Sequence, residues 1–246
     1  GTPEKIGGWT RLNTVKFLGV ARSMWNWITL GGQNLIGVGT NIKFYIENGG
    51  AYNDITPLRS TTSAGDVTFS ASSTTLSAAV TSTSAVNIPI TDATGFPISG
   101  LVLIDSEVIS YAGVTDNTLT GCVRGASKIV DDVSTSTTAA THSNGAGVTC
   151  FTILVTDVGH GAGNGDFVTY TDAVTLGGNF TAAVLNLEYE IVSVETDATY
   201  TILAKTFSNT TITFSNIAST SSDSGNGGSA IVGAYQLNTG TDTSTE

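Results

Sequence analysis

The chain has 246 residues and a net charge of −11, with 40% hydrophobic but only 12% charged residues, about half the charged share of an average soluble domain. Its nine Lys and Arg residues give no basic footprint, which excludes nucleic-acid binding, and its acidity disfavours anionic membrane surfaces. No run of 18 or more apolar residues occurs, so we predict no membrane span.

Residues 1–62 are predicted to form an N-terminal β platform unit. Strands are expected at 34–40 and 43–47, where short apolar segments end in glycine turns. Pro57 then stops the ladder because it lacks a donor. Segment 15–28 is the best helical candidate in the chain, although a glycine interrupts it. The size of the unit is typical of one sheet or one propeller blade.

The middle of the chain reads as a second small unit. Residues 61–87 are rich in Ser, Thr and Ala; residues 67–69 can form a short strand, and the stretch after them resembles a linker. Residues 86–149 are predicted to be a small β module. Its strands are expected at 86–90, 101–104, 107–111 and 118–125. A Ser/Thr/Ala loop is expected at 131–140.

A third unit occupies residues 150–237. Its strands are expected at 151–156, 166–170, 187–194, 199–204 and 230–237. A glycine-dense loop is predicted at 157–165 and a flexible one at 219–229. The polar tail 238–246 is expected to be flexible. The turn signals between so many short strands predict an all-β protein of two or three small sandwich-like or barrel-like modules.

The two histidines are the candidate catalytic bases of the chain. A Ser-His-Asp triad needs a histidine that is held by a carboxylate and touches a nucleophile. His160 lies between Asp157 and Asp166 in a loop, and His142 lies at a loop end. We interpret both as turn residues that bond backbone groups.

Several acidic residues are candidate metal ligands or hydrolytic groups. The segment from Asp157 to Asp166 has the composition of a calcium loop, but its acids stand only at the two ends and tight glycine turns explain it. Asp131-Asp132 lies in a low-complexity loop. Glu188 and Glu190 share one strand face, which indicates a solvated face and not a glycosidase pair. We assign no catalytic, cofactor-binding or metal-binding residue and predict that the chain is not an enzyme.

Aromatic residues gather near the N-terminus. They are Trp9, Trp25, Trp27, Tyr45 and Tyr52. Such residues are enriched in cores and in subunit interfaces, which is our interpretation, while stacking on a sugar is the alternative.

The chain has only two cysteines, Cys122 and Cys150. Two cysteines make no disulfide framework for a domain of this size. Whether they pair stays open at the level of sequence.

The three units resemble pieces of structural proteins from tailed bacteriophages. The first is similar to the opening of tail nozzle or tail-stabilisation proteins, on Gly7-Gly8-Trp9, Trp25, Gly37-Val38-Gly39-Thr40, Lys43-Phe44-Tyr45 and Asp54-Ile55-Thr56-Pro57. The second resembles a small β module of many phage virion proteins, on Gly95-Phe96-Pro97, Gly100, Ile104-Asp105, Glu107-Val108-Ile109, Tyr111, Leu119-Thr120-Gly121-Cys122, Arg124-Gly125 and His142-Ser143. The third resembles the module that follows in the same proteins, on His160-Gly161, Gly165-Asp166-Phe167-Val168-Thr169, Leu187, Glu190 and Tyr200-Thr201-Ile202.

The resemblance carries implications for architecture. Nozzle proteins build on a propeller-like platform and assemble as rings, typically hexameric. Residues 65–69 and those from 151 onward look like parts of one pattern, so 63–85 and 150–237 are expected to make one sandwich-like module that carries 86–149 as an insertion. The chain holds only the first part of such a platform. It begins without an initiator Met or signal-peptide core, which we interpret as a processed product or a fragment.

We therefore predict a structural virion protein of a tailed phage, located in the extracellular particle. It would form part of the tail nozzle or tube through contacts with copies of itself and with other virion proteins. The alternatives are a subunit of an extracellular filament and a receptor-binding module for host surface glycan.

Overall fold

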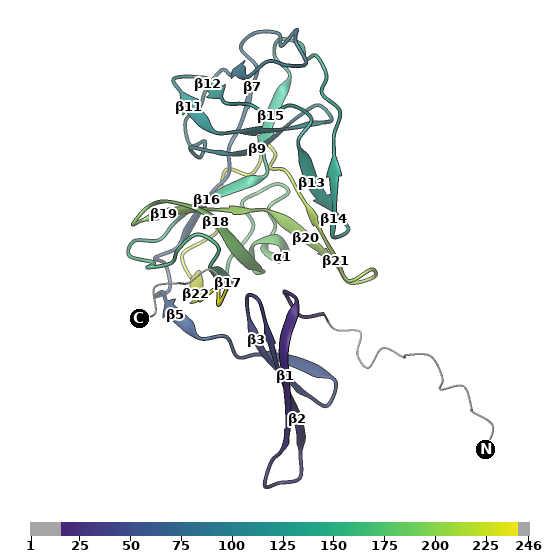
Figure 1. Cartoon of the computed structure of the whole chain (residues 1–246). Helices are drawn as coiled ribbons and strands as arrows, with labels where there is room; N and C mark the ends of the chain where they lie inside the picture. The colour runs from purple at the N-terminus through teal and green to yellow at the C-terminus, as the bar shows by residue number, and fades with distance from the viewer. Residues whose placement is uncertain (1–15, 241–246) are drawn as a thin grey trace, which may run out of the picture. The chain divides into compact units, whose positions relative to one another are not determined.

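The computed structural model describes residues 16–240 and confirms the prediction of an all-β protein (Figure 1). The strands pair antiparallel, and the only helix in the described residues is the single turn α1 (Ala182–Leu185). No helix within 16–240 is both long enough and apolar enough to cross a membrane. The chain divides into two compact units, which we call unit 1 (Gly1–Leu58 with Gln236–Glu246) and unit 2 (Arg59–Tyr235).

Unit 1 is built on a four-stranded meander. Its strands, in order, are β1 (Ala21–Ile28), β2 (Asn34–Thr40), β3 (Phe44–Asn48) and β4 (Ala51–Asp54). The expected strands at 34–40 and 43–47 correspond to β2 and β3. The helical candidate at 15–28 is wrong, because β1 pairs with β2 along its length from Ala21↔Thr40 to Ile28↔Asn34. The ladder overrides a weak helical periodicity.

The end of the chain also contributes to unit 1. The Nζ of Lys43, whose side chain is fully buried, donates to Asp54 at 2.7 Å and to the side-chain oxygen of Gln236 at 2.6 Å. The backbone N–H of Thr239 donates to the carbonyl of Ile42 at 3.2 Å. Residues 238–240, assigned from sequence to a flexible tail, therefore pack here, and Asn238 is buried.

A seven-stranded sheet forms the base of unit 2. Its spatial order is β5 (Leu58–Thr61), β22 (Val232–Gln236), β17 (Phe167–Thr171), β18 (Glu188–Thr196), β19 (Thr199–Leu203), β16 (Thr152–Thr156) and β6 (Thr68–Ser70). The sheet is strongly curved: the rings of Phe69 on β6 and Tyr170 on β17 meet at 4.9 Å although three strands separate them in the sheet order.

The curved sheet encloses a core that includes a chain of tyrosine hydroxyls. Tyr200 bonds Tyr170 on one side and Tyr235 on the other, the latter at 2.8 Å, and Tyr235 donates to the buried carboxylate of Asp157. All three rings are buried. The hydroxyls thereby satisfy one another, as buried polar groups must.

A second hydrophobic cluster fills the small module that lies between β6 and β16 in sequence. One sheet has the order β10 (Glu107–Tyr111), β9 (Gly100–Ile104), β15 (Gly147–Cys150), β7 (Ser73–Thr75). The other has the order β11 (Gly113–Thr115), β12 (Thr118–Thr120), β8 (Asn87–Pro89). Between them lie the buried side chains of Leu76, Ile88, Ile104 and Leu119, among others.

The chain enters and leaves this module through adjacent segments. The N–H of Cys150 donates to the carbonyl of Ser72 at 3.2 Å, and β7 pairs with β15. The pairing places the entry near residue 72, and Leu76 and Val80, in the stretch that reads as a linker, are core residues. A small cluster around Val108 and Phe151 packs where the two modules of unit 2 meet.

Two hairpins lie in segments for which the sequence predicted a loop or predicted no strand. Strand β13 (Ser127–Val130) precedes the expected loop at 131–140, and its partner β14 (Val133–Ser136) lies within that loop. Asp131 and Asp132 both have positive φ and form the two-residue turn between them, which Asp tolerates better than most residues. Strands β20 (Lys205–Ser208) and β21 (Thr213–Asn216) form the other hairpin.

The loop at 219–229, expected to be flexible, is held by the buried carboxylate of Asp223. Its oxygens accept hydrogen bonds from the backbone N–H groups of Gly178, Asn179, Phe180 and Thr220 at 2.8–3.0 Å. The prediction of flexibility was based on composition. Composition does not show that one buried acid accepts hydrogen bonds from four backbone N–H groups.

Candidate assembly surface on the first sheet

The register of unit 1 sorts its side chains onto two faces, because directly paired residues point to the same side of a sheet. The set Met24, Val38, Tyr45 and Asp54 runs across one face, which we call the inner face. The set Trp25, Gly37, Ile46 and Asn53 runs across the other, which we call the outer face.

The inner face has a small core of its own. Val38 and Tyr45 are buried. The Phe17 ring lies 5.8 Å from the Tyr45 ring and 5.0 Å from the Tyr52 ring. The hydroxyl of Tyr45 accepts the N–H of Leu18 at 3.1 Å, so the segment before β1 covers this side of the sheet.

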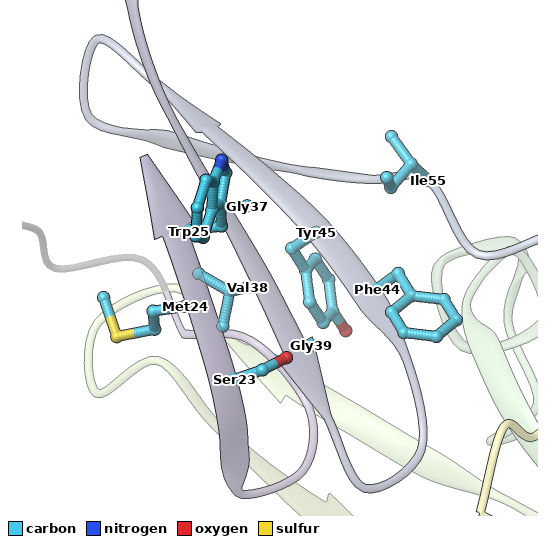
Figure 2. A pocket seen from close by; sticks show the side chains of 9 residues that line it. All are labelled: Ser23, Met24, Trp25, Gly37, Val38, Gly39, Phe44, Tyr45 and Ile55. Atoms are coloured by element: carbon cyan, nitrogen blue, oxygen red, sulfur yellow. The ribbon is translucent and has the colours of Figure 1, made fainter. Parts of the chain in front are cut away.

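The outer face has no such cover and carries a hollow that we call the trough (Figure 2). Its volume is about 310 Å³. Strand β2 contributes no side chain to this face at Gly37 or Gly39, while β1 places Trp25 on one side and β3 places Phe44 on the other. The trough is lined by Ser23, Met24, Trp25, Gly37, Val38, Gly39, Phe44, Tyr45 and Ile55.

Both glycines are required by close neighbours. A Cβ on Gly39 would lie 2.5 Å from the Ser23 hydroxyl, and one on Gly37 would lie 3.2 Å from the Trp27 ring. The missing side chains of the two glycines thus leave room for the Ser23 hydroxyl and the Trp27 ring above β2.

The walls of the trough are apolar and exposed. Trp25 is 75% exposed, Ile55 51% and Phe44 41%. Among the outer-face side chains that line the trough, only that of Ser23 is polar, through its hydroxyl. Contiguous exposed apolar surface of this kind is typical of interaction sites.

The turn between β1 and β2 forms an exposed apolar projection, which we call the hairpin tip and define as residues 28–32. Leu30 is fully exposed and Ile28 is 68% exposed. Gly32 has φ +81, so the turn depends on its glycine. β1 is also an edge strand of its sheet, and an exposed apolar edge is a surface on which proteins associate.

Charge is distributed unevenly between the units. Residues 59–235 contain 15 Asp and Glu but only four Lys and Arg, a net charge of −11. The described part of unit 1 contains three Lys and Arg and two Asp and Glu. Copies of the chain therefore repel one another through unit 2 but not through the first sheet.

The interpretation of His142 as a residue whose side chain bonds backbone groups is wrong, because its buried ring lies between two carboxylates, the exposed Asp105 and the buried Glu107. Its ring nitrogens lie 2.7 Å from Asp105 and 2.8 Å from Glu107. Glu107 also accepts two bonds from Arg124, at 2.8 and 2.7 Å, and the backbone N–H groups of Gly125 and Ala140. Both ring nitrogens face carboxylates, so neither is directed at a nucleophile.

Opposing effects set the pKa of Glu107. Burial raises it, but the Arg124 guanidinium, the two backbone N–H groups and His142 together outweigh burial and lower the pKa to about 2. The groups around Glu107 thus keep an ionised carboxylate in the interior, and their evident role is to fix the β9–β10 turn to the loops at 124–125 and 140–142.

His160 is held by backbone groups, as its sequence context suggested. Its Nδ1 accepts the N–H of Ala162 at 3.1 Å, and its Nε2 lies 3.3 Å from the carbonyl of Thr196. Asp166 accepts from Arg59 at 3.1 Å and from the N–H of Gly163 at 2.8 Å. Asp157 belongs to the tyrosine chain, and its burial raises its pKa. The two acids thus serve separate networks.

The other acidic candidates make structural contacts. Asp131 accepts from the Thr213 hydroxyl at 2.9 Å and Asp132 from the N–H of Phe214 at 2.8 Å, which ties one hairpin to the other. Glu188 and Glu190 share a face of β18, opposite the buried Tyr189. Within residues 16–240 no three His, Cys, Asp or Glu side chains gather as a metal site.

Among the aromatic candidates, the structure separates three roles. Tyr45 and Tyr52 belong to the inner face, Trp27 leans over Gly37, and Trp25 is a wall of the trough. Trp9 lies outside the described residues. The sequence grouped these aromatics, but the glycine floor that makes a trough of them emerges only from the register.

The two cysteines are free and buried. Burial raises the pKa of the Cys122 thiol to about 11 and that of Cys150 further. Both shifts lower the fraction of the reactive thiolate form at neutral pH.

Unit 2 carries a second hollow, of about 440 Å³, at the edge strand β7. It is lined by Ser73, Thr74, Thr75, Gly147, Thr149, Ser219, Thr220 and Ser221. These residues provide hydroxyls and methyls but neither an aromatic platform nor a charge. The trough in unit 1 is therefore the more distinctive surface.

Comparisons with models of protein families, with curated proteins and with solved structures found no match to this chain.

Proposed function

We propose that the chain is a structural subunit of a tailed-phage virion, a part of the tail nozzle or tube that works by contacts with copies of itself. The observation that carries the proposal is the exposed apolar surface of the first sheet, which has an aromatic-walled trough on its outer face and an apolar hairpin tip at the turn between β1 and β2. The residues that resemble nozzle proteins include Trp25, Gly37-Val38-Gly39 and Phe44-Tyr45, and all of these line the trough.

The distribution of charge supports the same reading. Unit 2 is strongly acidic, so repeated copies avoid contact through it, whereas the first sheet is nearly neutral and apolar. The buried polar networks described above hold strands and loops of unit 2 in fixed positions, which favours a rigid unit. A subunit that bears mechanical load needs such rigidity more than it needs a reactive group.

Binding of a host glycan through Trp25 is the other candidate, because an exposed indole can stack on a sugar ring. The trough argues against it. Sugar hydroxyls require several polar partners, and the outer face offers them only the Ser23 hydroxyl within the trough.

Cryo-electron microscopy of the native particles that contain the chain tests the proposal. We expect copies arranged in a closed ring at the end of a short tail, with unit 1 at the subunit contacts. An open helical filament of repeating copies would contradict the tail assignment and favour an extracellular fibre. Density for the chain only at the outer surface, with no contact between copies, would favour receptor binding.

A further inference from the structure

We infer that the hairpin tip of one copy inserts into the trough of the next copy, so that the first sheet carries both halves of a head-to-tail contact. The inference rests on the proposed function and specifies its mode of assembly. The occupant is therefore a second copy of this chain, and the inserted side chains are Leu30 and Ile28.

The chemistry of the two surfaces matches. The trough presents Trp25, Phe44 and Ile55 around a floor of two glycines, with one hydroxyl. An aliphatic side chain fits such a lining because it leaves no polar group without a partner. The tip presents two exposed aliphatic side chains, those of Leu30 and Ile28. After Leu30 the turn contains Gly31 and Gly32, which add no side chains next to it.

The two surfaces lie at different points along the sheet. Ile28 follows Trp25 by three residues, or about 10 Å along β1 at roughly 3.3 Å per residue, and Leu30 lies beyond it. One copy can therefore offer its tip to one neighbour while its trough receives the tip of another. Such a heterologous contact generates a ring when the rotation closes and a filament when it does not.

The area involved is that of a modest contact. Taking about 200 Å² for a fully exposed large side chain, the five apolar residues of tip and trough expose on the order of 700 Å². Specific interfaces bury at least about 1,200 Å² in total, so the flanking backbone must contribute the rest. A single contact is then weak, and closure of a ring adds avidity. Assembly should accordingly be steeply dependent on concentration.

Two variants separate the halves of the contact. Leu30→Asp charges the tip and leaves the trough intact, and Trp25→Asp removes a wall of the trough and leaves the tip intact. Both positions are exposed, so we expect both variants to keep the wild-type circular dichroism spectrum. Val158→Asp, at an 81% exposed position of unit 2, makes the same change of charge and serves as the matched control.

The masses of the species are measured by sedimentation velocity, for each variant alone and for an equimolar mixture. We expect the wild type and Val158→Asp to form oligomers and each sheet variant alone to be monomeric. In the mixture we expect a heterodimer and nothing larger, because only the tip of the Trp25→Asp chain and the trough of the Leu30→Asp chain remain competent.

Two results would overturn the inference while leaving the proposed function standing. One is oligomerisation of Leu30→Asp to the wild-type extent, which would show that the tip is not inserted. The other is monomeric variants that also fail to form a heterodimer, which would indicate a face-to-face contact of two identical surfaces. A wild-type chain that stays monomeric at every concentration would instead count against self-assembly itself.

Discussion

The substitution Glu107→Gln should strongly destabilise the small module of unit 2. Glu107 is fully buried and accepts five hydrogen bonds, and the side chain of its partner Arg124 is only 5% exposed. A glutamine has one acceptor oxygen, and its NH₂ group would face donors. Removing one partner of a buried ion pair costs about 3–5 kcal/mol, and we expect a loss of that size in the free energy of unfolding at pH 7.

The destabilisation caused by Glu107→Gln should depend on pH and should become smaller as the pH falls. The pKa of Glu107 is lowered from 4.5 to about 2 in the folded chain. The carboxylate therefore contributes stability that is fully present above about pH 5 and is lost as pH falls from 4.5 through 2. At 1.36 kcal/mol per pKa unit the contribution is about 3 kcal/mol.

Urea denaturation followed by circular dichroism, at pH 7 and again near pH 2.5, measures both quantities. The difference between wild type and Glu107→Gln should shrink as the pH falls. Glu190→Gln, at an exposed position of β18, is the control and should change stability by less than about 0.5 kcal/mol. A difference below about 1 kcal/mol at pH 7, or one that is unchanged at pH 2.5, would refute the reasoning.

Three further outcomes follow from the buried polar groups. Asp223→Ala leaves four backbone N–H groups without their acceptor, and it should lower the free energy of unfolding in urea by about 3–5 kcal/mol. Amide protection against hydrogen exchange should also be lost in the loop at 219–229, and unchanged protection there would contradict the assignment. Tyr200→Phe breaks the hydroxyl chain at its centre and should cost about 1–3 kcal/mol, whereas Tyr52→Phe should cost little; equal costs would argue against the chain. Cys122 and Cys150 should resist iodoacetamide at pH 8 in the folded protein and react in urea, as followed by mass spectrometry, and rapid labelling without denaturant would show that one is accessible.

The strands that the sequence predicted best are short, mainly apolar segments bounded by turn residues. Segment 34–40 corresponds to β2, and 107–111 corresponds to β10. In β18 the alternation around Tyr189 is strong enough to predict which side Glu188 and Glu190 occupy. Patterns of this kind are local, so a single sequence contains them in full.

The misinterpreted segments depend on contacts distant in sequence. β1 has little alternation because its side chains remain largely exposed, and only its pairing with β2 makes it a strand. The expected loop at 131–140 contains strand β14 and the turn of the β13–β14 hairpin. The side chains of Asp131 and Asp132 in that turn accept hydrogen bonds from another hairpin more than 80 residues away. The local composition of these segments does not indicate such distant contacts.

The candidate surface was predictable in its residue types but not in its form. The aromatic cluster near the N-terminus indicated an interface. The trough, however, needs Gly37 and Gly39 on the same face as Trp25 and Phe44, which is a property of register across three strands. The exposure of Leu30 likewise depends on the position of the turn between β1 and β2.

The most direct test of the central claim is the mass of the purified chain as a function of concentration. Sedimentation velocity from about 10 µM to about 1 mM spans the affinities expected of weak structural contacts. The account predicts a rise from the 25.1 kDa monomer to a defined oligomer, with Leu30→Asp remaining at the monomer mass. A single 25.1 kDa species across the whole range would contradict it.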